Sequence, residues 1–213
     1  MKLKNSLTTL AFAAISLFAA NAMASAITYD TRAYAGTTPA DFAASWAGQA
    51  SAITSNSLSN FNGTVPVNNS IAHLTVSFVA GAPLSVQFQI APDAGFGGAL
   101  YLDGALLGSS YTTDNLWWNN SWAQTAELLD TANLALTSGS HIFEGYWVED
   151  CCSGTQGGRF NLNNGAWQNL TVQNLNTLAA VTAPAAAIPE PGMLALFGLG
   201  LAGLAFSRRQ RAA

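Results

Sequence analysis

The chain has 213 residues, of which half are hydrophobic and only 8% are charged, a length typical of one domain with additional segments. Both lysines and three of the five arginines lie near the ends, so residues 25–188 keep two basic and ten acidic residues, a net charge of −8. So negative a body repels phosphate backbones and disfavours nucleic-acid binding.

The N-terminus has the three parts of a secretory signal peptide. Lysines provide a basic start, residues 7–20 form an apolar stretch, and Ala22 and Ala24 flank Met23 in a small-x-small cleavage site. We therefore predict that residues 1–24 are removed after Ala24. A retained anchor fits less well, because the apolar stretch falls short of the ~20 residues needed to cross a membrane.

Residues 25–176 are predicted to form one all-β domain, an antiparallel β-sandwich or jelly roll, because apolar and polar residues alternate in several short segments. Asp103 and Gly104 are a strong hairpin signal. Residues 40–60 are compatible with either a short helix or a loop. The predicted strands lie within residues 74–80, 84–90, 99–108, 134–149 (with a Ser-Gly-Ser turn), 159–163 and 167–173.

The segments "FQIAPDAGFGGALYLDGALLG" and "LALTSGSHIFEGYWVE" resemble the lectin-like β-sandwich of the anthrax-toxin protective antigen. The resemblance covers residues 86–149 and implies a β-sandwich, with Ca²⁺-assisted sugar binding in some relatives. Those relatives use two consecutive aspartates at the calcium site. In this chain the corresponding turn has Asp93 followed by Ala94.

Three aspartates, Asp93, Asp103 and Asp114, are candidate Ca²⁺ ligands in predicted turns. Calcium takes six to eight oxygen ligands and accepts carboxylates and backbone carbonyls readily. The alternative, which we favour, is that these side chains bond to nearby backbone groups, as aspartate commonly does in turns. If these aspartates do bind a ligand, Ca²⁺ is the cofactor that they indicate.

The segment "NLWWNNSW", residues 115–122, is the predicted glycan contact. Sugars stack on aromatic rings, and the amide of Asn119 can bond to hydroxyls. Consecutive residues of a strand point to opposite faces, so at least one of Trp117 and Trp118 should be exposed, and we expect Trp118 or Trp122 to be the more exposed ring. The alternative is that one or two of these rings pack in the core.

The two cysteines, Cys151 and Cys152, are adjacent in "EDCCSGTQGGRF". An exported chain with an even number of cysteines favours oxidation, so we predict a vicinal disulfide, with intermolecular pairing or two free thiols as alternatives. Nothing in the sequence supplies further ligands at a spacing typical of zinc.

No catalytic constellation is apparent, and we expect the protein not to be an enzyme. His73 and His141 both lie in predicted strands, where packing is the commoner role. Glu149 and Asp150 are adjacent, so on a strand they would point to opposite faces.

The C-terminus combines a tether with a distinctive tail. Residues 177–188 are predicted to be an Ala/Thr/Pro linker, followed by Pro189-Glu190-Pro191, an uncharged apolar run and a basic cluster that includes Arg208 and Arg209. As a helix this run would cover about 22 Å, less than the ~30 Å hydrocarbon core.

The order of these features resembles the PEP-CTERM sorting signal of Gram-negative bacteria, over residues 189–211, and the Cys-Cys-x-Gly string resembles one subgroup of that family. The resemblance implies export, transient anchoring in the inner membrane, and processing by an exosortase. It further implies release to the cell surface or to the exopolysaccharide matrix.

Taken together, these features predict an exported, non-enzymatic protein of the cell surface or biofilm matrix that binds exopolysaccharide or a surface glycan. One alternative is a structural matrix protein without glycan specificity. A glycan-active hydrolase is a third, less favoured hypothesis.

Overall fold

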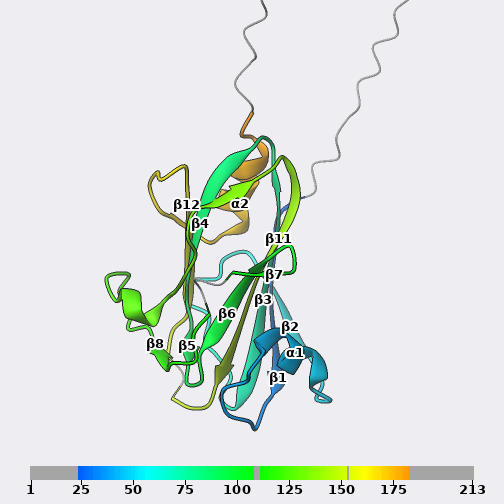
Figure 1. Ribbon diagram of the computed structural model, residues 1–213, viewed down its shortest axis with the longest axis vertical. Coiled ribbons are helices and arrows are strands. Elements are labelled where there is room, and N and C mark those ends of the chain that lie inside the picture. Colours follow the sequence, from blue (N-terminus) through cyan, green and yellow to red (C-terminus); the bar gives the residue numbers. More distant parts are fainter. Residues whose placement is uncertain (1–23, 108–110, 153, 183–213) are drawn as a thin grey trace, which may run out of the picture.

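The computed structural model describes residues 24–107, 111–152 and 154–182, which form an antiparallel β-sandwich with two short helices (Figure 1). The fold class expected from the sequence is confirmed. The strands are β1 Ala26–Ala33, β2 Thr54–Leu58, β3 Ser70–Ala80, β4 Leu84–Ala91, β5 Asp93–Ala94, β6 Gly98–Leu102, β7 Ala105–Leu106, β8 Leu116–Trp117, β9 Leu129–Asp130, β10 Leu134–Leu136, β11 Gly139–Glu149, β12 Gly157–Leu162 and β13 Gln168–Asn169; the helices are α1 Phe42–Gly48 and α2 Val172–Ala179.

Two sheets and a short ribbon make up the sandwich. The larger sheet has the strand order β2-β1-β3-β11-β6-β7, and the smaller has the order β10-β4-β12-β13, with β9 also paired to β4. Strands β5 and β8 pair only with each other. All of these pairings are antiparallel.

The core lies between the two sheets, where both contribute fully buried side chains. In the larger sheet, burial alternates along β3, as expected for a strand with one face against the core. Phe88 of β4 stacks on Phe143 of β11 across the sandwich, with ring centroids 4.2 Å apart and planes 13° apart. Burial of one such side chain stabilises the fold by roughly 1.5–3 kcal/mol.

The predicted turns have two different outcomes. Asp103 and Gly104 form the β6–β7 hairpin with φ of 50° and 79°, positive as in the tight hairpin turns for which such a pair is favoured. The Ser-Gly-Ser turn instead carries the chain from one sheet to the other, because β10 pairs with β4 whereas β11 pairs with β3 and β6.

One helix resolves an open alternative and the other corrects a predicted strand. Helix α1 lies within the ambiguous residues 40–60 and packs Phe42 and Trp46 on the outer face of the larger sheet. The predicted strand at 167–173 is wrong beyond β13, because the Thr171 side chain accepts from the Asn174 N–H and caps helix α2.

Helix α2 also corrects the predicted boundary between domain and linker. Leu175 and Leu178, three residues apart on one helix face, are fully buried in the main core. The folded domain therefore extends beyond the predicted boundary at residue 176, because residues 177–179 belong to helix α2 and not to a linker.

The first and last described segments meet at one end of the molecule. The Ser25 backbone N–H donates to Oδ1 of Asn176 in α2 over 3.0 Å. Figure 1 shows α2 at this end and the β5–β8 ribbon toward the opposite end. The predicted apolar helix and basic cluster, the residues of the Pro-Glu-Pro motif and nearly all of the predicted signal peptide lie outside the described residues. Among the residues that are described, no helix is long and apolar enough to span a membrane.

Candidate functional site

A hollow of about 310 Å³ lies where the β5–β8 ribbon meets the C-terminal end of β11. We call it the acidic hollow, because three carboxylates contribute to its walls. A vicinal disulfide and an exposed tryptophan form the apolar part. Its lining residues are Asp93, Gly95, Asn115, Trp117, Glu149, Asp150, Cys151 and Cys152.

The register of β5 and β8 brings an acid and an aromatic ring together. Asp93 is directly opposite Trp117, and side chains that are opposed in an antiparallel pair lie on the same face. The Trp117 backbone N–H donates to Oε2 of Glu127 over 2.8 Å, which fastens β8 in place. The Trp117 side chain is 63% exposed and is therefore available to a ligand.

Glu149 is the least solvated acid of the hollow. It is 1% exposed, and neither carboxylate oxygen has a hydrogen bond of normal geometry among the described residues, although the backbone N–H groups of Gly95 and Cys151 lie near the carboxylate. Burial, followed by the nearby charges of Asp93 and Asp150, raises the pKa of Glu149 to about 8, and the backbone amides of Gly95 and Cys151 offset only part of this rise. A buried carboxyl group without partners destabilises the fold once it ionises.

Asp150 lines the same hollow as Glu149, contrary to the expectation that the two would point to opposite faces. The reason is that β11 ends at Glu149, so strand alternation no longer governs the following residue. Both residues also line a second hollow of about 330 Å³, whose other residues are Tyr34, Ala35, Gly36, Thr37, Asn69 and Phe96.

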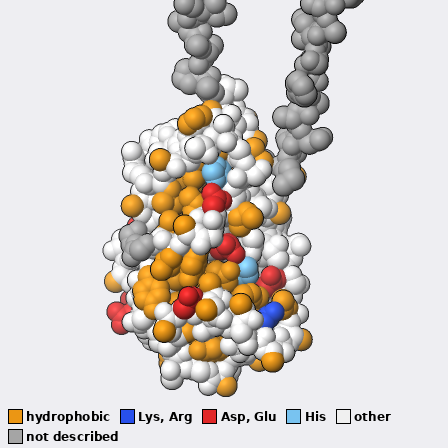
Figure 2. Space-filling view, turned by 45° about the vertical axis from the view of Figure 1, so that its right-hand side comes forward, with side chains coloured by type: hydrophobic (Ala, Val, Ile, Leu, Met, Phe, Trp, Pro, Cys, Tyr) orange, Lys and Arg blue, Asp and Glu red, His pale blue; other side chains and the backbone are white. Residues whose placement is uncertain are grey.

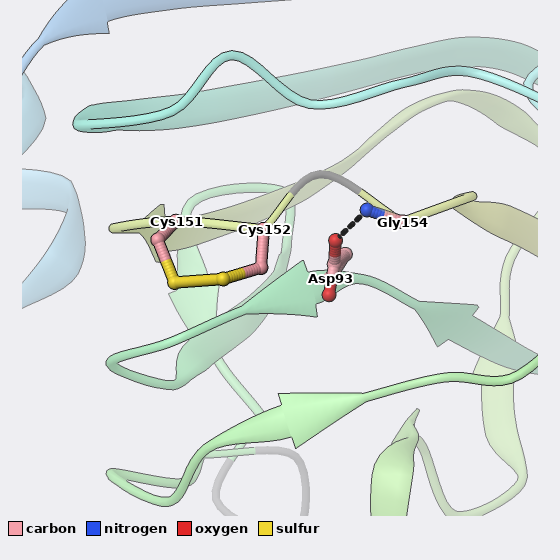
Figure 3. Close-up of a disulfide and its surroundings, with 4 residues drawn as sticks. All are labelled: Asp93, Cys151, Cys152 and Gly154. Atoms are coloured by element: carbon pink, nitrogen blue, oxygen red, sulfur yellow. Dashed lines mark hydrogen bonds between the residues drawn. A yellow bond between two sulfur atoms is a disulfide. The ribbon is translucent and has the colours of Figure 1, made fainter.

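The predicted vicinal disulfide is confirmed between Cys151 and Cys152. It lies in the connection between β11 and β12, and next to it the carboxylate of Asp93 accepts a hydrogen bond from the Gly154 N–H (Figure 3). Cys152 has φ of 70°, a left-handed conformation that a non-glycine residue adopts at a cost of roughly 1–2 kcal/mol. The disulfide and the Asp93 bond thus shape this wall.

The three tryptophans of residues 115–122 have different environments. Trp118 is only 6% exposed and packs with Ala91 and Leu128, so the expectation that it would be more exposed than Trp117 is wrong. Within the two-residue strand β8, Leu116 points into the core and Trp117 points outward; Trp118 follows the strand and turns inward.

Trp122 and Asn119 lie outside the acidic hollow. The Trp122 ring is 4.8 Å from that of Trp118, and the Arg159 guanidinium lies 4.4 Å from the Trp122 centroid and 4.3 Å from that of Trp167. Trp122 therefore belongs to a packed aromatic cluster. Asn119 is exposed, and its backbone N–H donates to Oε1 of Gln124.

The three candidate calcium ligands do not form one site. Of Asp93, Asp103 and Asp114, only Asp93 lines the hollow. Asp103 instead bonds to His141 over 2.8 Å, while Asp114 is exposed. Within the described part of the chain, no group of three or more His, Cys, Asp or Glu side chains could hold a metal ion.

Neither histidine lines the acidic hollow, and each pairs with an acidic residue. Figure 2 shows the histidine side chains beside acidic ones. His73 Nε2 lies 2.9 Å from Oε1 of Glu144, and its ring stacks on Tyr146 at 4.2 Å with planes 4° apart. Burial lowers the pKa of His73, and Glu144 only partly compensates. These contacts identify His73 as a packing residue of the larger sheet.

Solved structures with this fold include PA14 domains. A structure titled "Crystal structure of PA14 domain of MpAFP Antifreeze protein" is 9% identical, with a TM-score of 0.50, and the match covers 80% of this chain and 94% of that one. Another, titled "PA14 sugar-binding domain from RTX adhesin", is 10% identical over 71% of this chain and 97% of that one, with a TM-score of 0.49. No curated protein matches the chain. The chain is therefore similar in fold to the PA14 domain of that antifreeze protein, which agrees with the β-sandwich expected from residues 86–149.

Residues 187–209 match the PEP-CTERM protein-sorting motif. This confirms the resemblance seen around Pro189, Glu190 and Pro191. The chain thus combines a β-sandwich similar in fold to a PA14 domain with a motif that marks exported proteins for exosortase processing and sorting to the cell surface.

Proposed function

We propose that this protein binds carbohydrate at the cell surface or in the exopolysaccharide matrix, without catalysis, and that the acidic hollow is its binding site. The observation that carries the proposal is Trp117, a 63% exposed ring at the wall of a hollow that also contains Asp93 and Asn115. A sugar presents apolar C–H faces and polar hydroxyls, so it needs both kinds of wall.

The acidic hollow has both an apolar and a polar wall. Trp117 and the Cys151–Cys152 disulfide are apolar surfaces, and the carboxylate and amide oxygens accept hydrogen bonds from hydroxyl groups. Its volume, about 310 Å³, lies at the lower end of the range for small-molecule sites, which is roughly 300–1,000 Å³. A single sugar unit of a longer chain is a ligand of suitable size.

Processing and release complete the proposal. Exosortase would cleave near Pro189–Pro191 and free the folded domain from a transient inner-membrane anchor. Of the three candidate Ca²⁺ ligands, Asp93 alone lines the hollow, and the assay below tests whether Ca²⁺ takes part. Asn119 and Trp122 would contact only a glycan that extends beyond the hollow.

The test measures retention of residues 25–188, which include the whole described fold, on polysaccharide from the native host. Trp117→Ala is expected to reduce retention at least tenfold, whereas Ile142→Ala, which removes another exposed hydrophobic side chain, serves as the matched control and should not. Retention is measured with Ca²⁺ and again with a chelator, which decides whether the cation takes part.

Two outcomes would contradict the proposal. Equal retention of wild type and Trp117→Ala would remove the acidic hollow as the site. No retention of the wild type in either condition would favour the alternative, a structural matrix protein without glycan specificity.

A further inference from the structure

The acidic hollow contains three carboxylates and no basic side chain. Glu149 is buried with no hydrogen bond of normal geometry to either carboxylate oxygen among the described residues, and Asp93 and Asp150 lie close enough to act on its charge. Ionised carboxylates at such a site repel one another, and burial increases the repulsion. An opposite charge is what the hollow lacks.

The described part of the chain has no spare Lys or Arg side chain to supply that charge. Residues 25–188 contain only two basic residues, and both are engaged elsewhere. Arg32 donates to the carbonyl oxygens of Trp46 and Gln49 and lies over the Trp46 ring at 4.9 Å. Arg159 lies between Trp122 and Trp167 and donates to Gln89. Without a ligand, protonation of Glu149 relieves the repulsion; a compensating positive charge would have to come from a ligand.

The spacing of the acids suits an organic ammonium better than a metal ion. Calcium needs several oxygens converging at about 2.3–2.6 Å, and no group of three or more acidic, His or Cys side chains in the described residues could hold a metal. One oxygen of Asp93 is also already bonded to the Gly154 N–H. An ammonium group has three donors and bonds to separated acceptors at longer distances.

The ring of Trp117 adds a second attraction for a cation. Trp117 is the residue opposite Asp93 in the β5–β8 ribbon, and its face is exposed at the hollow. A cation within about 6 Å of a tryptophan ring is attracted to the ring face, and the same face stacks on the C–H groups of a sugar. A single tryptophan can thus contact both parts of an amino sugar.

We infer that the acidic hollow recognises an amino sugar, with its protonated amine at Asp93, Glu149 and Asp150 and its ring on Trp117. The inference rests on the proposed function and names the substrate class: glycans with unacetylated amino groups. Neutral and anionic glycans lack the group that the three acids require.

The experiment compares two oligosaccharides of equal length and linkage, one of glucosamine and one of N-acetylglucosamine, by calorimetric titration of residues 25–188. The buffer is slightly acidic, so that the free amine is protonated, and contains a chelator. The glucosamine oligomer is expected to bind about tenfold tighter or more, the equivalent of one charge-assisted hydrogen bond. Added salt should weaken this preference.

Charge-neutral variants locate the effect. Asp150→Asn should reduce the preference for the free amine several-fold. Glu149→Gln should also reduce it, because a bound ammonium group lowers the raised pKa of Glu149 and ionises the carboxyl in the complex. Asp41→Asn is the control: it removes the same charge from the N-cap of α1, where Asn caps a helix as well as Asp, and should leave the preference unchanged within about twofold.

The outcomes separate this inference from the proposed function. Equal binding of both oligomers, or tighter binding of the acetylated one, with continued dependence on Trp117, would overturn the amino-sugar inference alone. Binding only when Ca²⁺ replaces the chelator would assign the compensating charge to a metal and also overturn it. No binding of either oligomer, together with no retention on native polysaccharide, would overturn both.

Discussion

Asp103 and His141 are joined by a 2.8 Å contact between Oδ2 and Nδ1, which fastens the β6–β7 hairpin to β11. The other ring nitrogen of His141, Nε2, lies 3.0 Å from the carbonyl oxygen of Thr137. A carbonyl oxygen and an ionised carboxylate can only accept hydrogen bonds. Both contacts are therefore hydrogen bonds only when His141 is the charged imidazolium, in which both ring nitrogens donate.

This pair predicts a stability that depends on pH. Burial opposes the charged form, but the bonds to Asp103 and Thr137 outweigh it, and the pKa of His141 is raised above 6.5. Its contribution is therefore complete below about pH 6.5 and is lost as the pH rises through the raised value. Burial raises the pKa of Asp103, but the hydrogen bonds from His141 and the Ile142 N–H lower it by more, so that this pKa lies below 3.8. The contribution of the pair is therefore also lost in strong acid.

Thermal unfolding of His141→Gln at a series of pH values checks this prediction. The variant should be less stable than wild type by about 0.5–1 kcal/mol near pH 5.5, since Asp103 is half exposed, and the difference should vanish at alkaline pH. His73→Gln is the contrast. Because the pKa of His73 is lowered, the difference in unfolding free energy between wild type and His73→Gln should grow as the pH rises. A constant deficit in His141→Gln would contradict the prediction.

Glu149→Gln is expected to stabilise the protein at alkaline pH. The folded-state pKa of Glu149 is about 8, against 4.5 for the free side chain, so wild-type stability declines as the pH rises from about 4.5 to 8. The neutral isostere lacks this decline and should be more stable by about 1–3 kcal/mol above pH 8, after allowance for relaxation around the charge. Denaturant titrations at about pH 5 and pH 9 measure it; equal pH profiles would show that Glu149 is solvated.

Trp122→Ala should reduce stability more than glycan retention. The ring packs on Trp118 and covers Arg159, and a partly desolvated cation–π contact of this kind contributes about 0.5–2 kcal/mol. Denaturation and retention assays on the same preparation test this, with Trp117→Ala as the variant of opposite pattern. Loss of retention in Trp122→Ala at unchanged stability would place Trp122 in the binding site.

Replacing both cysteines with serine should affect binding more than folding. A bond between neighbouring residues closes almost no loop, so it constrains the unfolded chain by only about 1 kcal/mol or less. The folded state, however, loses an apolar wall of the acidic hollow and the restraint on the left-handed backbone at Cys152. We expect a reduced glycan affinity with a melting temperature within a few degrees of wild type; the reverse pattern would identify the disulfide as a stabilising element alone.

The large features of the fold could be predicted because they follow from local patterns. Alternation in β3 and β4 marks strands with one buried face, and Asp103-Gly104 supplies the positive φ values of a hairpin. The vicinal disulfide needs only adjacent cysteines in an exported chain. Helix α2 was missed because Val172 continues a strand-like run, while the buried spacing of Leu175 and Leu178 lies partly in the presumed linker.

The site was harder to predict because its geometry depends on pairing between short, distant segments. Strand β8 has two residues, and only its pairing with β5 determines that Trp117 and not Trp118 points outward. Glu149 and Asp150 share a hollow because β11 ends between them, a boundary that alternation does not mark. The excess of ten acids over two bases within residues 25–188 was the available signal for an acidic site, beyond the single candidate ligand Asp93.

The bond between Ser25 and Asn176 has a consequence for how the domain is presented to its surroundings. The first and last described segments meet beside α2, whereas the β5–β8 ribbon, at which the hollow lies, is toward the far end (Figure 1). A polymer held in the hollow would therefore lie away from the end at which the chain continues toward the sorting motif. Capture of a polymer and cleavage of the anchor would then not compete for space. The same domain could hold a strand while still attached to the cell and carry it away once released.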